Sequence, residues 1–421
     1  MSIVTARPEL IALLEDSRGA ARMLATASTA HKNAGLAAIA DAIEANIPAI
    51  VAENAKDLEN GRANNIGDGL LDRLLLDEKR LQSIAGAVRQ IISLTDPVGQ
   101  VVRGNDMPNG IHLVQVRVPF GVVGAIYEAR PNVTVDIAAI ALKSGNATVL
   151  RGGSAAENSN RILVALIQDA LASVGLPRLT VQTIDPFGRA GATELMTARG
   201  YVDVLIPRGS QSLIDSVVLE SKVPVIETGA GVVHLVIDDS APLEWAVEIA
   251  HNSKVQRPSV CNALETILVM RPAAARVLPA VCERLTQAGV IIHGDVSTRE
   301  IWPAAIPATN EDWSTEHMSL ELSIKVVDSL DEALDHIRTY GTHHTDSIIT
   351  NDVSHAERFL AEVDSAVVMV NASTRFTDGG EFGFGAEVGI STQKLHARGP
   401  MGLPELTSTK WLVRGSGQIR Q

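Results

Sequence analysis

The chain has 421 residues, of which 46% are hydrophobic and 20% are charged, and its formal net charge at pH 7 is −13. This composition excludes a disordered or low-complexity protein, and the acidic balance argues against non-specific binding of nucleic acid. No apolar run is long enough for a membrane span, the first residues lack the pattern of a secretory signal, and two cysteines without framework spacing predict a cytoplasmic protein.

A chain of this length predicts two or three domains, and its first hundred residues are predicted to be mainly helical. Apolar positions there recur at intervals of three and four residues, for example over residues 34–61, where Gly61 is the expected end of a helix. Residues 111–119 then alternate between apolar and polar side chains, which predicts a strand.

Between residues 121 and 229, short apolar runs alternate with amphipathic segments. The predicted strands are residues 121–129, 147–153, 179–185, 202–207 and 223–229. The predicted helices are residues 133–146, 158–177, 190–200 and 210–222. This alternation predicts a parallel sheet with right-handed crossovers, and such a sheet binds ligands at the carboxyl ends of its strands.

A second alternating block predicts another α/β domain, joined to the first near residues 227–231. Its predicted strands are residues 234–239, 265–270, 290–295, 346–352 and 366–371, and its predicted helices include residues 244–254 and 274–289. The glycine-rich residues 373–389 are predicted to form a loop, and residues 406–415 a closing strand.

The two cysteines have different surroundings. Cys282 shares one face of a predicted helix with Leu278, Val281 and Leu285, which indicates a core residue. Cys261 lies at a junction, after a helical pattern and before an apolar strand, and therefore has no such face. A reactive thiol needs access and a stabilised thiolate.

Positive charge near Cys261 is available from Lys254 and Arg257, although basic residues at a helix end also complement the helix dipole. A metal site is not expected. The sequence contains neither HExxH nor CxxC, and His343 and His344 are adjacent rather than spaced along one helix face.

Four residues accompany Cys261 in a recognisable order: Asn132 in RPNVT, Arg151 in TVLRGGS, Glu227 in VIETGAG and Glu316 in EHMSLEL. This order resembles the aldehyde dehydrogenase superfamily over most of the chain. The segments PFGVVGAIYEARPNVTVDIAAIALKSGNATVLRGG, QRPSVCNALET and EFGFGAEVGISTQKLHARGPMGL resemble its gamma-glutamyl phosphate reductase branch.

The resemblance implies an aldehyde-dehydrogenase-like α/β fold, with two parallel-sheet domains and a small β arm for oligomerisation. The NADP-binding domain is then expected at residues 1–109, 121–228 and 375–398. The catalytic domain is expected at residues 229–374, and the arm at residues 110–120 and 399–421.

The implied reaction is the NADPH-dependent reduction of L-glutamyl 5-phosphate to L-glutamate 5-semialdehyde plus phosphate, in L-proline biosynthesis. Cys261 is the implied nucleophile, which forms a thioester. Asn132, with the backbone N–H at the cysteine, is the implied oxyanion donor, although an asparagine there also suits a helix N-cap. Glu227 matches a water-activating glutamate, which this reaction does not need, so a positional, proton-transfer or structural role stays open.

Four residues are implied to bind NADP(H). A cation such as Arg151 at the adenosine ribose suits the 2′-phosphate, although an acid, Asp185, ends the next strand. Gly209 and Ser210 open a helix, whose N–H groups attract the pyrophosphate. Glu316 matches a contact to the nicotinamide ribose.

The implied partners are small-molecule substrates, a homodimer or homotetramer of this chain, and glutamate 5-kinase; neither nucleic acid nor membrane is expected. The substrate phosphate has three candidate cations, Arg130, Lys254 and Arg257. Three alternatives remain: another acylating or NAD(P)-dependent aldehyde dehydrogenase, a cysteine hydrolase pairing Cys261 with His251, and an inactive scaffold.

Overall fold

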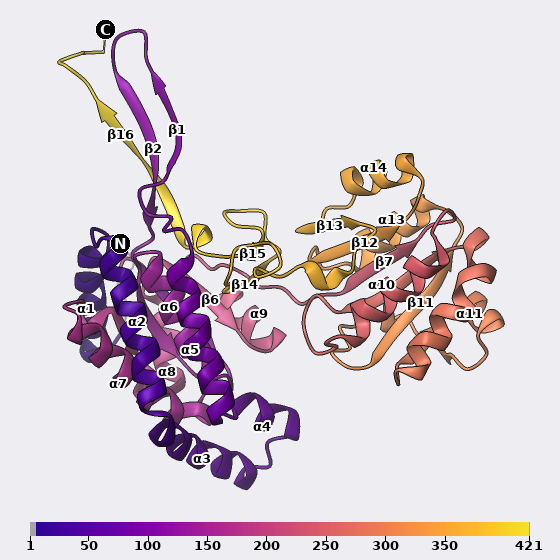
Figure 1. Ribbon diagram of the computed structural model, residues 1–421, viewed down its shortest axis with the longest axis horizontal. Helices are drawn as coiled ribbons and strands as arrows, with labels where there is room; N and C mark the ends of the chain where they lie inside the picture. Colours follow the sequence, from indigo (N-terminus) through magenta and orange to yellow (C-terminus); the bar gives the residue numbers. More distant parts are fainter. Residues whose placement is uncertain (1–5, 421) are drawn as a thin grey trace. The chain divides into compact units, whose positions relative to one another are not determined.

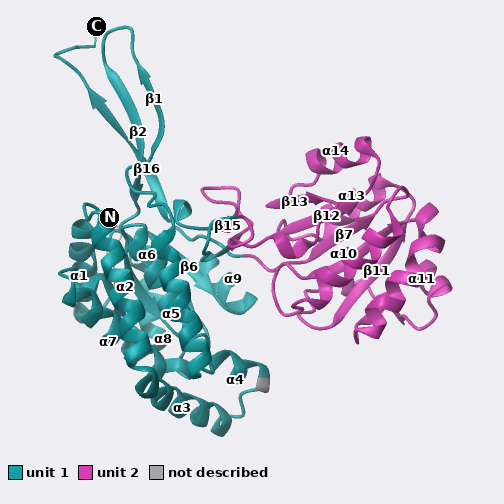
Figure 2. Cartoon of the chain, viewed as in Figure 1, with its two compact units in different colours: residues 1–228, 383–389, 401–421 teal, residues 229–382, 390–400 magenta. Residues whose placement is uncertain are grey.

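The computed structural model describes residues 6–420 and divides them into two compact units (Figures 1 and 2). Unit 1 comprises the described residues up to 228, together with 383–389 and those from 401 onward. Unit 2 comprises residues 229–382 and 390–400. This division differs from the predicted one in the tail, because residues 375–382 and 390–398 belong to unit 2 rather than to the first domain.

Unit 1 begins with a helical layer. Its helices are α1 (Pro8–Leu24), α2 (Thr29–Ala45), α3 (Ile47–Ala63), α4 (Asp68–Leu74) and α5 (Glu78–Ser93). The predicted helix over residues 34–61 is interrupted at Asn46, and Pro48 in the first turn of α3 suits a new helix start. The predicted stop at Gly61 is wrong. A Cβ there would lie 2.9 Å from Leu71 Cδ2, so this glycine serves close packing.

Behind this layer lies a four-stranded parallel sheet in the order β5-β4-β3-β6. Its strands are β3 (Val122–Tyr127), β4 (Ala147–Arg151), β5 (Val181–Thr183) and β6 (Val204–Arg208). The crossovers carry α6 (Asn132–Lys143), α7 (Glu157–Ser173), α8 (Gly188–Thr197) and α9 (Gln211–Glu220), with short 3₁₀ turns at Ser154–Ala156, Arg178–Thr180 and Asp185–Phe187. The strand order reverses at β3, so the crevice beyond the carboxyl ends of β3 and β6 is the expected ligand site.

The predicted strand at residues 223–229 is wrong. Only an isolated bridge joins Val225 to Leu205. Pro224 accepts a hydrogen bond from Leu205 N through its carbonyl but has no N–H to donate, so the ladder does not continue.

A three-stranded antiparallel sheet forms the arm of unit 1, with β2 (His112–Pro119) between β1 (Val101–Asp106) and β16 (Thr407–Arg414) (Figure 1). The sequence pattern does not predict β1, because all six of its residues are exposed and carry no alternation. A short 3₁₀ turn, Pro404–Leu406, precedes β16, and β14 (Gly389–Ser391) pairs with β15 (Gly399–Met401) in a separate ribbon.

Unit 2 is built on a seven-stranded parallel sheet in the order β10-β9-β11-β8-β7-β12-β13. Its strands are β7 (Val233–Ile237), β8 (Leu264–Met270), β9 (Ile291–Gly294), β10 (Ile306–Pro307), β11 (Glu321–Val327), β12 (Thr345–Ile349) and β13 (Val367–Val370). Its helices are α10 (Leu243–Val255), α11 (Arg271–Gln287), α12 (Val296–Ile301), α13 (Leu330–Tyr340) and α14 (Val353–Glu362), with 3₁₀ turns at Asp312–Ser314 (η4) and Thr374–Phe376 (η5).

The alternating side chains of β7 and β8 divide between two apolar clusters. Leu235 and Ile267 belong to the cluster that includes α11, whereas Val236 and Leu268 belong to the cluster that includes α13. Cys282 lies in the first cluster and is fully buried, which confirms its prediction as a core residue. Burial raises the pKa of its thiol to about 12, so it carries no thiolate at neutral pH.

Among the described helices, no single one is long and apolar enough to cross a membrane. The pair α2 and α3 passes that test only when taken together, and the two helices are bent by 71°.

Candidate active site

Cys261 lies in a turn between α10 and β8, and its side chain is half-buried. The following residue, Asn262, is buried and holds the turn in place. Its Nδ2 donates to the Thr377 carbonyl at 2.7 Å, and its own carbonyl accepts from Thr374 Oγ1 at 2.8 Å. The thiol is therefore carried by a braced turn rather than by a helix or strand.

Gly231 packs directly against the backbone of this turn. A Cβ at residue 231 would overlap the Cys261 carbonyl oxygen, far inside van der Waals contact. Because a backbone carbonyl has little freedom to give way, only glycine fits here without a shift of the turn. Gly231, the second glycine of VIETGAG, thus allows the segment before β7 to approach the cysteine.

Glu316 is tied to the same glycine. Its Oε1 accepts a hydrogen bond from Gly231 N at 2.8 Å, and burial raises the pKa of this half-buried carboxyl. Gly231, Cys261 and Glu316 precede β7, β8 and β11, which are parallel neighbours. In unit 2 these residues therefore gather at the amino ends of the strands, whereas the sequence pattern predicts ligand binding at the carboxyl ends.

Lys254 is unavailable to a ligand. It is completely buried, and its Nζ lies 2.8 Å from Glu265 Oε2, which is also buried. Burial lowers the pKa of the lysine and raises that of the glutamate to about 7, because each charged form loses its hydration. The candidacy of Lys254 as a substrate-phosphate ligand is therefore wrong.

His251, the partner of Cys261 in the hydrolase alternative, lies on α10 and is half-buried. Burial lowers its pKa, and the charged groups that act on it are Arg284 and Glu248. Arg284 belongs to α11, so the electrostatic surroundings of His251 link it to that helix and give no support to a Cys–His pair.

In unit 1, Asn132 is the first residue of α6, and the helix has no side-chain N-cap. Its Nδ2 donates to Asp136 Oδ2 at 2.9 Å, one helical turn away. Burial raises the pKa of Asp136 to about 6, against the opposing effects of Asn132 and Arg208. The N-cap interpretation of Asn132 is wrong, and its carboxamide is oriented by Asp136 with one N–H in use.

A cavity of about 660 Å³ opens at the carboxyl ends of β3 and β4 in unit 1, beside α9. Arg151, the last residue of β4, lines it together with Arg189 and Glu128. The Nε of Arg151 is buried and has no hydrogen-bond partner among the described residues. An unsatisfied buried guanidinium nitrogen suits an anionic ligand, so the lining fits a phosphate-bearing dinucleotide.

Asp185, the acid that follows β5, is already engaged. Its Oδ1 accepts from Gly152 N at 2.7 Å and its Oδ2 accepts from Asn160 Nδ2 at 3.3 Å. It does not line the cavity, and burial raises its pKa. This carboxylate holds the turn after β4 and leaves Arg151 as the charged residue at that strand end.

The start of α9 also has a carboxylate partner. Ser210 caps the helix, and Ser210 N donates to Glu128 Oε2 at 3.0 Å. A Cβ at Gly209 would lie 2.7 Å from the same oxygen. Glu128 therefore occupies the position at which the sequence predicts a pyrophosphate, and a dinucleotide there must displace it.

Glu227 is half-buried in the extended segment that ends the first stretch of unit 1, at residue 228. Ile226 N donates to the Leu205 carbonyl at 2.9 Å, and Thr228 Oγ1 donates to the Pro207 carbonyl at 3.1 Å. The segment is thus anchored along β6 on both sides of the glutamate. Glu227 and Asn132 lie in unit 1, whereas Cys261 and Glu316 lie in unit 2.

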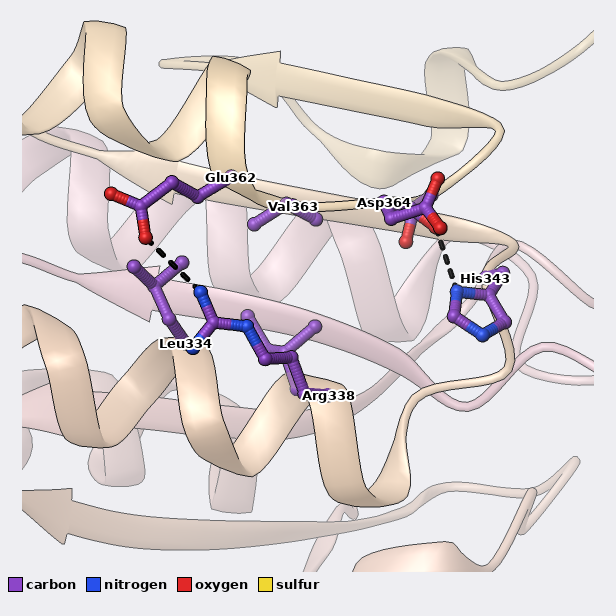
Figure 3. Close-up of a pocket in the computed structure, with 8 residues that line it drawn as sticks. Leu334, Arg338, His343, Glu362, Val363 and Asp364 are labelled. Carbon is purple, nitrogen blue, oxygen red and sulfur yellow. Dashed lines mark hydrogen bonds and ion pairs between the residues drawn. The ribbon is translucent and has the colours of Figure 1, made fainter.

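A second hollow, of about 30 Å³, lies in unit 2 beside His343 (Figure 3). Arg338 pairs with Glu362 at 3.0 Å across it, and His343 Nδ1 contacts the Asp364 carbonyl at 2.7 Å. Its neighbour His344 is buried and contacts Thr345 Oγ1. Within residues 6–420, no group of three or more His, Cys, Asp or Glu side chains is arranged to hold a metal ion.

Two residues of this region have no signal in the sequence pattern. Gly231 is one of 33 glycines, and only the overlap with Cys261 distinguishes it. Arg375 lies in the glycine-rich tail, and its Nε donates to Gln256 Oε1 at 2.7 Å on the segment that leads to Cys261. No short sequence motif reveals either residue, because both act through contacts between segments that are distant in sequence.

The sequence profile of the aldehyde dehydrogenase family matches residues 6–299 of the chain. The gamma-glutamyl phosphate reductase of Leifsonia xyli subsp. xyli is 66% identical over 397 residues, which cover 94% of this chain and 94% of that protein. The one from Clavibacter michiganensis subsp. michiganensis is 63% identical over 412 residues, with 98% of this chain and 95% of that protein covered. The crystal structure of gamma-glutamyl phosphate reductase from Thermotoga maritima matches 98% of this chain and 100% of its own, with a TM-score of 0.96 and 44% identity.

Proposed function

The chain belongs to the aldehyde dehydrogenase family and, within it, to the gamma-glutamyl phosphate reductases, and from this premise we propose that it reduces L-glutamyl 5-phosphate to L-glutamate 5-semialdehyde with NADPH and releases phosphate. It is an enzyme of the oxidoreductase class, and its fold is of the α/β class. The observation that carries the proposal is the half-buried Cys261 in its braced turn, in contrast to the fully buried Cys282.

Cys261 acts as the nucleophile in this proposal. Its thiolate attacks the acyl carbonyl, a C–S bond forms, and the C–O bond to phosphate breaks with its electron pair leaving on the phosphate oxygen. The backbone N–H at Cys261 and Nδ2 of Asn132 stabilise the intermediate oxyanion. Loss of one such donor typically costs on the order of 3 kcal/mol of transition-state stabilisation. Asp136 supports this role, because it fixes the Asn132 carboxamide and leaves the second N–H for the oxyanion.

The nicotinamide cofactor that the family uses supplies, when bound, the hydride that reduces the thioester. In unit 1, Arg151, Gly209 and Ser210 are the residues that would hold it, with Arg151 selecting NADPH through the 2′-phosphate. Glu316 in unit 2 would contact the nicotinamide ribose. After reduction, Cys261 leaves the hemithioacetal as a thiolate and the aldehyde is released. Glu227 is proposed either to protonate the hemithioacetal oxygen and to take that proton back when Cys261 leaves, or to hold its segment in position.

The wider assignments follow the same premise. We propose a role in L-proline biosynthesis, in the cytoplasm, with glutamate 5-kinase as a partner in the same pathway. The arm is proposed to join subunits into a homodimer or homotetramer. Exposed apolar side chains on both edge strands support this: Val101 on β1 is 65% exposed and Val413 on β16 is 60% exposed.

The test runs the reaction in reverse, because the forward substrate is an unstable acyl phosphate. Glutamate semialdehyde should reduce NADP only when phosphate is present. Cys261→Ala should abolish turnover while NADPH binding persists, and Cys282→Ala should keep most activity because its thiol is only a core group. Turnover that needs coenzyme A, or water alone, in place of phosphate would assign another aldehyde dehydrogenase activity. Turnover equal to the unmodified enzyme in Cys261→Ala would refute the mechanism.

A further inference from the structure

The 3₁₀ turn η5 is fastened to the two segments that flank Cys261. On one side, Thr374 and Thr377 bond to Asn262, the residue after the cysteine, at 2.8 and 2.7 Å. On the other side, Thr374 N donates to Ser253 Oγ on α10 at 3.2 Å, and the hydroxyls of Ser253 and Ser373 lie 3.1 Å apart. Four polar contacts thus fix η5 beside the cysteine, all of them within unit 2.

Arg375 occupies the centre of this turn and is half-buried. Its Nε donates to Gln256 Oε1 at 2.7 Å, which orients the guanidinium along the segment between α10 and Cys261. Four groups act on its charge besides burial: Arg257 repels it, while Asp378, Glu381 and the Cys261 sulfur attract it. Burial and then Arg257 lower the pKa of Arg375, so Arg257 lies close enough to Arg375 for their charges to interact.

Two neighbouring arginines beside the turn that carries a thiol can form an anion site. A guanidinium presents its N–H groups in a planar fork that matches the oxygens of a phosphate, and it is never deprotonated at neutral pH. Asp378 and Glu381 offset part of the positive charge, so the site is suited to a group that binds and then leaves. Lys254, the remaining cation of this segment, is buried against Glu265 and cannot compete.

We propose that Arg375, together with Arg257, binds the phosphate of the acyl phosphate substrate beside Cys261. The inference rests on the proposed function, and it names the residues that receive the phosphate when the C–O bond breaks. The electron pair of that bond leaves on a phosphate oxygen, and the arginines stabilise the charge that develops there. In the reverse direction the same arginines hold inorganic phosphate for its attack on the thioester.

The experiment measures the Michaelis constant for phosphate in the reverse reaction of the full-length protein. Arg375→Ala should raise this constant about tenfold to a hundredfold, as expected for a lost charge-assisted pair, while that for NADP changes less than about twofold. Arg257→Ala should have a smaller effect in the same direction, because its side chain is exposed. Arg375→Lys should recover part of the loss, since a lysine keeps the charge without the fork. Arg358→Ala is the matched control, because Arg358 is a half-buried arginine of unit 2 that pairs with Asp331 and Glu362 instead.

A second readout does not depend on turnover. In a Cys282→Ala background Cys261 is the only thiol of the chain. Inorganic phosphate should slow its alkylation by iodoacetamide, because an adjacent dianion raises the pKa of the thiol and covers it. Arg375→Ala should remove this protection and Arg358→Ala should keep it.

The two readouts separate the inference from the function on which it rests. In one outcome, phosphate protects Cys261 only when Arg375 is present, in a protein that shows no phosphate-dependent turnover. That result would support the anion site and contradict the proposed reaction. An unchanged phosphate constant and unchanged protection in both Arg375→Lys and Arg257→Ala would overturn the inference, whether or not Arg375→Ala folds. The inference would also be overturned if inorganic phosphate did not protect Cys261 from alkylation in the Cys282→Ala protein.

Discussion

The carbonyl oxygen of Cys261 makes residue 231 the least tolerant position of the candidate site, because no side chain fits between the two backbones. Gly231→Ala should therefore move the cysteine turn and sever the hydrogen bond from Gly231 N to Glu316. We expect turnover to fall by about a hundredfold or more, as for a reacting group displaced by about 1 Å. Steady-state kinetics of the reverse reaction measures this loss.

Gly86→Ala is the matched control for that substitution. Gly86 lies inside α5, and a Cβ there meets nothing within 4 Å. It should leave turnover unchanged and stabilise the protein by about 0.5–1 kcal/mol, because alanine is the better helix former. Equal turnover in the two variants would contradict the tight approach of Gly231 to Cys261.

Arg151 is the residue on which cofactor choice is expected to depend, because its buried Nε has no hydrogen-bond partner in the part of the chain that the structure describes. Arg151→Ala should raise the Michaelis constant for NADPH much more than that for NADH. The difference should correspond to about 1.5–3 kcal/mol, the value of a hydrogen bond to a charged group. Arg161→Ala serves as the control, an exposed arginine of unit 1 paired with Glu53. Equal changes for both cofactors would show that Arg151 does not contact the 2′-phosphate.

At the scale of elements, a histidine on α13 and another directly before β12 are buried, and both are expected to lower the stability of unit 2 in acid. His336 lies among His234, Trp313 and Tyr340, and burial, followed by the charges of His234 and Lys325, lowers its pKa to about 3. Burial lowers the pKa of His344 to about 4. An unfolded histidine binds a proton near pH 6.5, whereas these two stay neutral when folded, so the unfolded state gains protons first as the pH falls.

The free energy of unfolding should therefore decrease as the pH falls below about 6.5, by about 2 kcal/mol for each histidine at pH 5. Asp136 and Glu265 act in the opposite sense, because their raised pKa values favour the folded state as the pH falls. The contribution of one histidine is isolated by comparing denaturant unfolding of His336→Gln with the unmodified protein at pH 7 and pH 5. The variant should lose less stability between the two pH values. An identical loss in both proteins would argue that His336 is protonated in the folded state.

At the scale of the whole molecule, the arm offers two edge strands with exposed apolar side chains. Trp411 on β16 is 47% exposed and stacks under Arg103 of β1, with 5.1 Å between the guanidinium carbon and the ring centre. Unpaired N–H and C=O groups on such edges favour pairing with another chain. Deletion of residues 407–421 should shift the mass measured by light scattering to that of a monomer and weaken activity. A full-length protein that is already monomeric at assay concentration would contradict the oligomer proposal.

Local patterns determine much of this fold. Hydrophobic residues that recur with a period of two predict most strands of the two parallel sheets, and a period of 3.6 predicts most of the helices beside them. Such patterns are local, because they depend only on which face of one element is buried. The same periodicity separates Cys282, on an apolar helix face, from Cys261 at a junction. The resemblance of the quoted motifs extends this reading to the family, which the comparisons confirm.

Contacts between segments distant in sequence lie beyond such patterns. The approach of Gly231 to Cys261, the position of Arg375 beside the same turn and the burial of Lys254 against Glu265 exist only once the strands are in register. The exposed strand β1 forms because β2 is available as its partner, not because of its own composition. The sequence by itself therefore determined the order of elements and the distinction between Cys261 and the core residue Cys282. The tertiary structure decided which glycine lies against the Cys261 turn and which charged side chains lie near it, because packing and charge act through space rather than along the chain.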